Sequence, residues 1–122
     1  MILIAEIDLG TAATEAYYLL REGYDVRTIK SGAELIEEAE KSQPELIIMD
    51  ILLPDVDGLK ITEALKANKK TAHIPILIYS FLDAPERAQK AGADAFLLKP
   101  IKPAKMMGIV KELLANRKSK ED

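Results

Sequence analysis

Residues 46–58 read Leu46-Ile47-Ile48-Met49-Asp50-Ile51-Leu52-Leu53-Pro54-Asp55-Val56-Asp57-Gly58, and this stretch decides the fold. Its first four residues are an unbroken apolar run of strand length, which is typical of a strand buried on both faces of a parallel sheet. Asp50 follows the run directly, and Asp57-Gly58 then opens a segment with helical spacing. The stretch therefore predicts a strand, a loop and a helix in succession, with a carboxylate where the strand ends.

Four further runs of strand length lie on either side of this one. They are Ile2–Ala5, Val26–Ile29, Ile76–Tyr79 and Ala95–Leu98. All but the second are nearly continuous aliphatic segments, so they too are predicted to be buried on both faces. The second is short and accompanied by the charged residues Asp25, Arg27 and Lys30, which is typical of a strand at the edge of a sheet.

The segments between the strands have the apolar spacing of helices. The faces expected to be buried are Ala13, Ala16, Tyr17 and Leu20 in the first helix; Leu35, Ile36 and Ala39 in the second; Ile61, Ala64 and Leu65 in the third; and Met106, Val110, Leu113 and Leu114 in the fifth. Ser31-Gly32-Ala33-Glu34 and Asp83-Ala84-Pro85-Glu86 are capping patterns that open the second and fourth helices. Gly23 and Gly92 are expected to end the first and fourth, and Pro103 to begin the fifth.

Strict alternation of strands and helices predicts an α/β fold, because parallel strands need helical crossovers between them. Five strands in a chain of this size favour a flavodoxin-like, doubly wound five-stranded parallel sheet in the order 2-1-3-4-5, covered by five helices. Residues 1–116 are expected to form this single domain. Residues 117–122 are polar and aperiodic, and are expected to be a C-terminal tail or the start of a linker.

Composition narrows the classes of function. The chain has 122 residues, 48% of them hydrophobic and 30% charged, with a net charge of −3 and no cysteine. The mild negative charge gives no basic surface for nucleic acid or for an anionic membrane, so direct binding to either is not expected. No apolar run approaches the roughly 20 residues that span a bilayer, and the first residues lack the basic start of a signal peptide. Together with the absence of cysteine, these features predict a soluble, cytoplasmic protein.

Polar side chains follow four of the five predicted strands. Glu6 and Asp8 follow the first, Asp50 the third, Ser80 the fourth and Lys99 the fifth. The carboxyl ends of parallel strands meet at one edge of the sheet, where such folds place their functional sites. Neighbouring carboxylates suggest a hard cation such as Mg²⁺, and a lysine and a hydroxyl can bind phosphoryl oxygens. A carboxylate in this setting can attack phosphorus and form an acyl phosphate.

Two motifs resemble the receiver domains of two-component signalling systems. Receiver domains carry an aspartate at the end of the third strand, a proline four residues later and a glycine eight residues later, and Asp50, Pro54 and Gly58 keep that spacing. The second motif is Ala91-Gly92-Ala93-Asp94-Ala95-Phe96-Leu97-Leu98-Lys99-Pro100, which resembles the fifth-strand segment of the family with its Lys-Pro pair. The resemblance covers essentially the whole chain.

This resemblance implies a role for each matching residue. Asp50 would accept a phosphoryl group, Lys99 would form an ion pair with it, and Ser80 would be the hydroxyl that turns toward it. Phe96 would be the aromatic side chain that moves with Ser80 during switching. The resemblance also implies that the Lys99–Pro100 peptide bond is cis.

The same resemblance implies a Mg²⁺ site made by Glu6, Asp50 and the backbone carbonyl of Leu52. Receiver domains usually carry a second acidic residue after the first strand, and here that position is Ile7, which has no oxygen to donate. Asp8 could reach back only from a different direction, since consecutive residues near a strand end point apart. We therefore expect Mg²⁺ binding to be weakened or lost. Phe81 is a second departure, because a small residue usually follows the switch hydroxyl; it either narrows access to the site or packs on the neighbouring helix.

Two functions remain open within the family. In the first, Asp50 is phosphorylated by a sensor histidine kinase or phosphotransfer protein, and the fourth helix, the strand Ala95–Leu98 and the fifth helix form a face that switches. That face would bind a downstream protein, a missing output domain or a second copy of the chain. In the second, the chain is a pseudo-receiver that binds a partner without phosphorylation. Neither is an enzyme, apart from slow self-phosphorylation from small donors and self-dephosphorylation.

Two functions from other classes are less well supported by the sequence. Asp55-Val56-Asp57-Gly58-Leu59 resembles the nucleophile loop of haloacid-dehalogenase-type phosphohydrolases, but such a loop should follow its strand directly. A flavodoxin would need a phosphate-binding loop rich in Ser, Thr and Gly after the first strand, and none is present. Both alternatives are therefore disfavoured.

Overall fold

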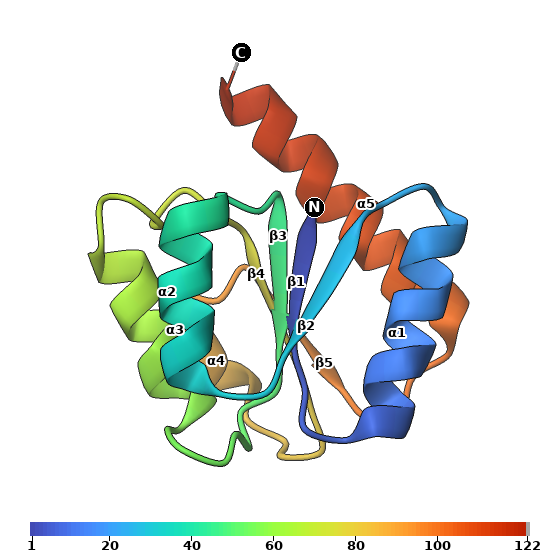
Figure 1. The fold of residues 1–122 in the computed structure, drawn as a ribbon, viewed down its shortest axis with the longest axis horizontal. Helices are drawn as coiled ribbons and strands as arrows, with labels where there is room; N and C mark the ends of the chain where they lie inside the picture. Colours follow the sequence, from blue (N-terminus) through green and yellow to red (C-terminus); the bar gives the residue numbers. More distant parts are fainter. Residues whose placement is uncertain (122) are drawn as a thin grey trace.

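The computed structural model describes residues 1–121 and contains five parallel strands in one sheet (Figure 1). The strands are β1 (Ile2–Ala5), β2 (Val26–Ile29), β3 (Leu46–Met49), β4 (Ile76–Ser80) and β5 (Ala95–Leu98). Their order is β2-β1-β3-β4-β5. The predicted fold class and strand order are confirmed, and β2 lies at an edge, as its charged residues indicated.

Five helices cover the two faces of the sheet (Figure 1). They are α1 (Leu9–Arg21), α2 (Gly32–Ser42), α3 (Gly58–Ala67), α4 (Pro85–Ala91) and α5 (Pro103–Glu121). Helices α1 and α5 pack on one face, where Leu19 and Val110 join a core cluster with β1 and β3 side chains. Helices α2, α3 and α4 pack on the other, where Leu35, Leu65 and Ala88 join the second cluster. The sheet is thus the middle of three layers.

The strand register aligns the carboxyl ends of the strands. Ala5 pairs with Met49, Met49 with Ile78, and Ile78 with Phe96. The amide of Asp50 donates a hydrogen bond to the carbonyl of Ala5 at 3.1 Å, so Asp50 leaves the sheet beside the end of β1. The residues that follow these strands are therefore held at one edge by backbone hydrogen bonds.

The buried face of α1 differs from the predicted one. Its buried residues are Ala12, Glu15 and Leu19, whereas Tyr17 and Leu20 of the predicted face are 58% and 55% exposed. Apolar residues occupy both faces of this helix, so their spacing alone could not fix its rotation. The packing of α1 against the sheet and α5 decides it, and that packing buries a glutamate.

Smaller corrections concern two other helices. In α3, Ala64 is exposed, and the buried face is formed instead by residues around Ile61 and Leu65. The N-cap of α4 is Ala84 rather than Asp83, and no side-chain cap hydrogen bond is found there within the described part of the chain. The capping pattern predicted that the Asp83 side chain would cap this helix. Instead, Pro85 at the first helical position fixes the backbone where the helix begins.

The predicted faces of α2 and α5 are largely confirmed. Leu35 and Ala39 are buried in α2, Ile36 is half-buried, and Met106, Val110, Leu113 and Leu114 are all buried in α5. Strand β5 is less buried than predicted, with Leu98 43% exposed, because it forms the second edge of the sheet. Helix α5 continues past residue 116 to Glu121, and Asp122 lies outside the described residues. The division into a domain of residues 1–116 and a tail of residues 117–122 stays a prediction.

Candidate functional site

Asp50 lies at the centre of the carboxyl edge of the sheet and is 5% exposed. One carboxylate oxygen, Oδ1, accepts hydrogen bonds from the Ser80 hydroxyl at 2.5 Å and from the Leu52 amide at 3.1 Å. The other, Oδ2, accepts a hydrogen bond from the Lys99 ammonium at 2.9 Å. Ser80 and Lys99, which are far from Asp50 in the sequence, therefore converge on one carboxylate.

Lys99 connects Asp50 to a second buried carboxylate. Its ammonium also forms an ion pair with Glu6, and all three side chains are nearly inaccessible to solvent. Burial by itself would lower the pKa of Lys99, but the hydrogen bonds to Glu6 and Asp50 outweigh it, so the pKa is raised above its usual value. Lys99 is therefore a fixed positive charge at neutral pH, placed between two carboxylates.

Two aromatic rings lie beside the Lys99 ammonium. Its nitrogen is 5.3 Å from the centre of the Tyr79 ring and 5.4 Å from that of Phe81, within the range of cation–π attraction. Phe81 is 65% exposed and borders the site at the surface. Whether it narrows access to the site or packs on the neighbouring helix stays a prediction. Sequence reasoning did not assign a role to Tyr79, because it reads as an ordinary residue of a buried strand.

Gly58 allows the loop after Asp50 to fold back against the strand end. A Cβ atom at this position would lie 2.3 Å from the Asp50 carbonyl oxygen and 2.7 Å from the Ile51 Cα, both backbone atoms that cannot turn aside. The Gly58 amide donates a hydrogen bond to the Ile51 carbonyl at 2.8 Å. The glycine of the motif is thus required by a close backbone approach directly behind Asp50.

The two other acidic residues of this loop cap helices. The Asp55 carboxylate accepts hydrogen bonds from the Gly32 amide at 2.8 Å and the Ala33 amide at 3.1 Å, at the start of α2. These bonds, that from Gly32 foremost, lower the pKa of Asp55. Asp57 accepts from the Leu59 amide at 2.7 Å and caps α3. Neither carboxylate is available as a phosphohydrolase nucleophile, which weighs further against that alternative.

Neither Asp8 nor Ile7 adds a side-chain oxygen to the cluster of Glu6, Asp50 and Lys99. Asp8 caps α1, where its Oδ2 accepts hydrogen bonds from the Thr11 hydroxyl at 2.5 Å and the Thr11 amide at 2.8 Å. These two bonds, the side-chain one first, lower the pKa of Asp8. Ile7 is 48% exposed. Among the residues that the structure describes, no three acidic, histidine or cysteine side chains are grouped as a metal site.

The oxygen donors that remain suit a weak Mg²⁺ site. They are the carboxylates of Glu6 and Asp50, which share Lys99 as their counter-ion. Mg²⁺ is held in many proteins by one or two carboxylates together with water and phosphate oxygens, so this pair is sufficient in number. The ammonium of Lys99 already neutralises both carboxylates, and a metal ion would have to compete with it.

Comparison with known proteins decides the family. The model of the response regulator receiver domain matches residues 2–111. The chain belongs to this family. It is 33% identical over 97 residues to the polar-differentiation response regulator DivK of Brucella ovis, an alignment that covers 77% of the chain and 79% of DivK. Receiver domains are modules of two-component signalling rather than enzymes in the usual sense.

Solved receiver domains have the same fold. A response regulator receiver domain protein from Methanospirillum hungatei superposes with a TM-score of 0.89 at 28% identity, covering 98% of this chain and 96% of that one. The receiver domain of the sensor histidine kinase PA1611 from Pseudomonas aeruginosa superposes with a TM-score of 0.85 at 26% identity, covering 93% and 96%, and holds a magnesium ion in its active-site cleft.

This receiver domain brings together most of the residues predicted to form its site. Glu6, Asp50, Ser80 and Lys99 are in contact, and the Lys99–Pro100 bond is cis, as expected. Phe96 lies apart from this cluster, half-buried in β5, beside a cavity of about 350 Å³ that Ala88 also lines. The chemical roles of these residues stay predictions.

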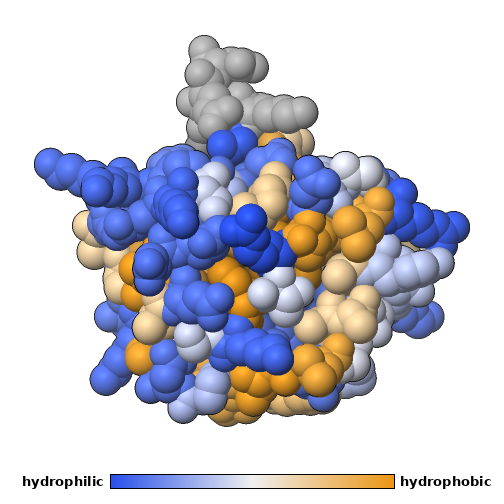
Figure 2. Space-filling view, viewed as in Figure 1, coloured by the Kyte–Doolittle hydropathy of each residue, from blue (hydrophilic) through white to orange (hydrophobic). Residues whose placement is uncertain are grey.

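An apolar rim surrounds the edge that carries Asp50. Its members are Ile7, Leu9, Leu52, Phe81 and Leu82, which are between 37% and 66% exposed. They follow β1, β3 and β4, and hydrophobic side chains are visible along the lower edge of Figure 2, where Figure 1 places the loops after these strands. Within residues 1–121, no helix is long and apolar enough to cross a membrane.

Proposed function

We propose that this receiver domain is a phospho-acceptor that takes a phosphoryl group onto Asp50. An oxygen of the Asp50 carboxylate attacks the phosphorus of a phosphohistidine, the phosphorus–nitrogen bond breaks, and the imidazole leaves as the neutral ring after taking up a proton from water. The product is an acyl phosphate on Asp50 that carries two negative charges where the carboxylate carried one, so it needs a cation close by. Lys99 and Ser80 are placed to supply an ion pair and a hydrogen bond to its oxygens.

One observation carries this proposal. The Asp50 carboxylate accepts hydrogen bonds from Lys99 and Ser80 at once, at 2.9 Å and 2.5 Å. An ammonium and a hydroxyl are the donors that a phosphoryl group on the same residue requires. Both donors lie at strand ends held by the sheet register, so they are already oriented.

A Mg²⁺ ion would be held weakly by Glu6, Asp50 and the Leu52 carbonyl. When bound, it would neutralise phosphoryl oxygens and so assist the transfer. Ile7→Asp restores a carboxylate beside Glu6, and we expect it to lower the Kd for Mg²⁺ at least about tenfold, or about 1.4 kcal/mol. A magnesium titration followed by amide chemical shifts measures this, with Leu9→Asp as a control that adds the same charge to the rim. Equal affinities in the wild type and Ile7→Asp would contradict the expected site.

The partners we propose are proteins. The apolar rim around Asp50 supports a phosphodonor with a complementary apolar surface, either a sensor histidine kinase or a phosphotransfer protein. The face formed by α4, β5 and α5 would carry the signal onward, to a downstream protein, an output domain or a second copy of the chain. The absence of cysteine fits action in the cytoplasm, where such kinases transfer phosphoryl groups.

The test is the intact mass of the protein after incubation with acetyl phosphate, with and without Mg²⁺. We expect one phosphoryl adduct in the wild type and none in Asp50→Asn, which keeps the size of the side chain but removes the nucleophile. Asp57→Asn serves as the matched control, because it changes a helix-capping aspartate in the same loop. Loss of the adduct in Asp57→Asn but not in Asp50→Asn would overturn the assignment. Slow loss of the adduct with time would show the self-dephosphorylation that we also propose.

A pseudo-receiver is the second candidate, and one observation favours it. Ile7 and Phe81 place hydrocarbon on the rim of the site, 48% and 65% exposed, where a metal ligand and a small residue are usual. A folded wild type that gives no adduct from either acetyl phosphate or a phosphorylated transfer protein would favour this candidate, and the search would then move to partners that bind without phosphorylation.

A further inference from the structure

Glu15 is a buried carboxyl group with no role in the site described above. It lies on the inner face of α1 and is 3% exposed. Neither of its carboxyl oxygens has a hydrogen-bond partner among the residues that the structure describes. Burial, followed by the nearby charge of Glu6, raises its pKa to about 8. A glutamate in a core position without a partner costs stability, and a ligand that donates hydrogen bonds to it would offset that cost.

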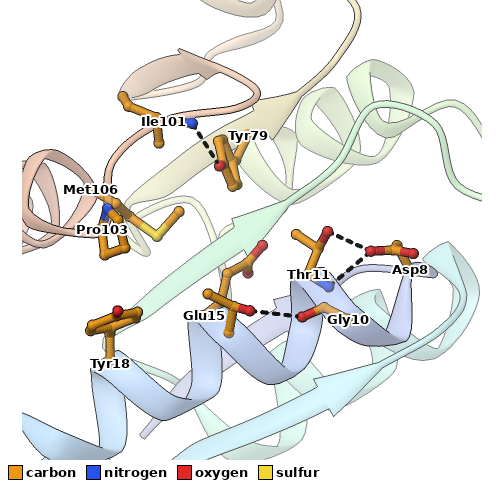
Figure 3. Close-up of a pocket in the computed structure, with 10 residues that line it drawn as sticks. Asp8, Gly10, Thr11, Glu15, Tyr18, Tyr79, Ile101, Pro103 and Met106 are labelled. Carbon is orange, nitrogen blue, oxygen red and sulfur yellow. Dashed lines mark hydrogen bonds between the residues drawn. The ribbon is translucent and has the colours of Figure 1, made fainter.

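Glu15 lines a cavity of about 390 Å³ between α1, the end of β4 and the start of α5. In Figure 3 its side chain rises from α1 toward the space between Tyr79 and Met106. The Tyr79 hydroxyl accepts a hydrogen bond from the Ile101 amide at 3.3 Å and keeps its own proton to donate. The cavity therefore has an apolar wall, phenol groups and a carboxyl group without a partner.

The charges around the cavity decide which ligand it suits. Within the part of the chain that the structure describes, its acidic lining residues are Asp8 and Glu15, and no basic residue lines it. Behind Glu15 lie Glu6, Asp50 and Lys99, which together carry one net negative charge when all three are ionised. An anion in the cavity would be repelled by Asp8, Glu6 and Asp50, and the nearby cation, Lys99, is already bound to two carboxylates. A cation would be attracted by the same groups.

Two aromatic residues strengthen the preference for an organic cation. Tyr18 and Tyr79 both line the cavity, and aromatic rings attract ammonium groups through their faces. Met106 and Ile101 offer apolar contact to a short hydrocarbon stem. A bare metal ion would not use these surfaces, because hard cations prefer several oxygen ligands.

We propose that this cavity binds an alkylammonium group, with the Glu15 carboxylate as its counter-ion and the Tyr18 and Tyr79 rings around its stem. The ammonium supplies the hydrogen-bond donors that both Glu15 oxygens lack. The same chemistry belongs to a free primary amine and to a lysine side chain of a partner protein. The site lies beside the phospho-acceptor and does not depend on the function proposed for Asp50.

The first experiment compares n-butylamine, which is an ammonium ion at pH 7, with the uncharged n-butanol by amide chemical-shift titration. We expect saturable shifts between Thr11 and Tyr18 and at Ile101 with butylammonium, and an affinity for butanol at least tenfold lower. Glu15→Gln keeps the size of the side chain and should abolish the difference between the two probes. Glu22→Gln is the matched control, since it neutralises an exposed carboxylate at the end of the same helix and should leave binding unchanged.

A second measurement covers the case in which Glu15→Gln does not fold. Glu15 is protonated before an ammonium binds at pH 7 and ionised afterwards, so calorimetry of the wild type in two buffers of different ionisation enthalpy should show release of about one proton. Equal binding of butylammonium and butanol, or binding without proton release, would overturn the proposal. Nα-acetyl-lysine methylamide separates the two sources: its saturable binding supports a lysine of a partner, and binding of butylammonium alone supports a free amine.

Discussion

At the scale of single residues, Lys99 is a buried cation in contact with two buried carboxylates. Its ammonium is buried between the Glu6 and Asp50 carboxylates, and the hydrogen bonds to both keep the pKa of Lys99 above its usual value despite burial. Taking such charges out of water is costly unless every partner is present. The site is therefore stable only as a complete set, and a phosphoryl group on Asp50 would change the balance of charge within it.

Lys99→Met should be strongly destabilising. It leaves two buried carboxylates without a cation, and removing one member of a buried ion pair typically costs about 3–5 kcal/mol. Lys111→Met is the control, because the Lys111–Glu22 pair is solvent-exposed, and such pairs contribute up to about 1 kcal/mol. Urea unfolding at pH 7 gives both free energies of unfolding. Similar losses in the two variants would show that Lys99 is not the counter-ion of Glu6 and Asp50.

Glu15 should make the stability of the protein depend on pH. Burial raises its pKa from 4.5 to about 8 in the folded state, so the folded protein holds a proton that the unfolded chain has already lost between these values. The free energy of unfolding attributable to Glu15 is therefore greatest below pH 4.5 and falls as pH rises toward 8, by up to about 1.4 kcal/mol per pH unit. Glu15→Gln should remove this slope, measured by urea unfolding between pH 5 and 8. If Glu15→Gln kept the same dependence of the unfolding free energy on pH, another group would be the one that holds the proton in the folded state.

The residues of the site were predictable because strand ends are visible in the sequence. A parallel sheet brings its carboxyl ends together, so Glu6, Asp50, Ser80 and Lys99 could be grouped from the sequence alone. Glu15 could not be added to them, because its environment depends on which face of α1 turns inward. The expected face contained Ala13 and Tyr17, and rotating the helix by about one residue was enough to bury a glutamate instead.

At the scale of elements, the loop from β3 to α3 is fixed by backbone contacts rather than by side-chain packing. Gly58 donates to the Ile51 carbonyl and lies against the Asp50 carbonyl, while Asp57 caps the helix that follows. Spacing in the sequence predicted this loop well, because the close backbone contact requires Gly58 and Asp57 caps the helix that it precedes. The start of α4 was predicted less well, because Pro85 at its first turn sets the backbone without the Asp83 cap.

Gly58→Ala tests the close approach in this loop. The added methyl group would lie 2.3 Å from the Asp50 carbonyl oxygen, so the backbone must move, at a cost of typically about 1–3 kcal/mol. Gly108→Ala is the matched control, since an added Cβ there meets no described atom within 4 Å and alanine favours a helix interior by about 1 kcal/mol. Thermal unfolding should show a lower Tm for Gly58→Ala and a higher one for Gly108→Ala. A Tm shift in the same direction for both would contradict the role of Gly58.

At the scale of the whole molecule, the sheet links Asp50 to the face formed by α4, β5 and α5. Ser80 ends β4 and pairs with Leu98 of β5, two residues beyond Phe96 on the same strand. Phe96 borders a surface cavity of about 350 Å³ between α4 and β5 and also packs against the core cluster on that face of the sheet. The alternation of strands and helices predicted the order of the strands in this sheet, because β–α–β crossovers allow few topologies.

Phosphorylation of Asp50 should therefore alter the face formed by α4, β5 and α5. Ser80 now donates its hydroxyl hydrogen bond to Asp50, and a phosphoryl oxygen would draw that donor outward, freeing space that Phe96 can enter. Amide shifts of the phosphorylated wild type, compared with Asp50→Asn treated in the same way, should change in these three elements as well as in the loops around Asp50. Phe96→Ala should still gain the phosphoryl mass but confine the shift changes to the loops, because the ring that couples Ser80 to α4 is gone. If the shift changes in the wild type were confined to the loops, phosphorylation would not switch this face. A partner that recognises the phosphoryl group would then bind at the apolar rim.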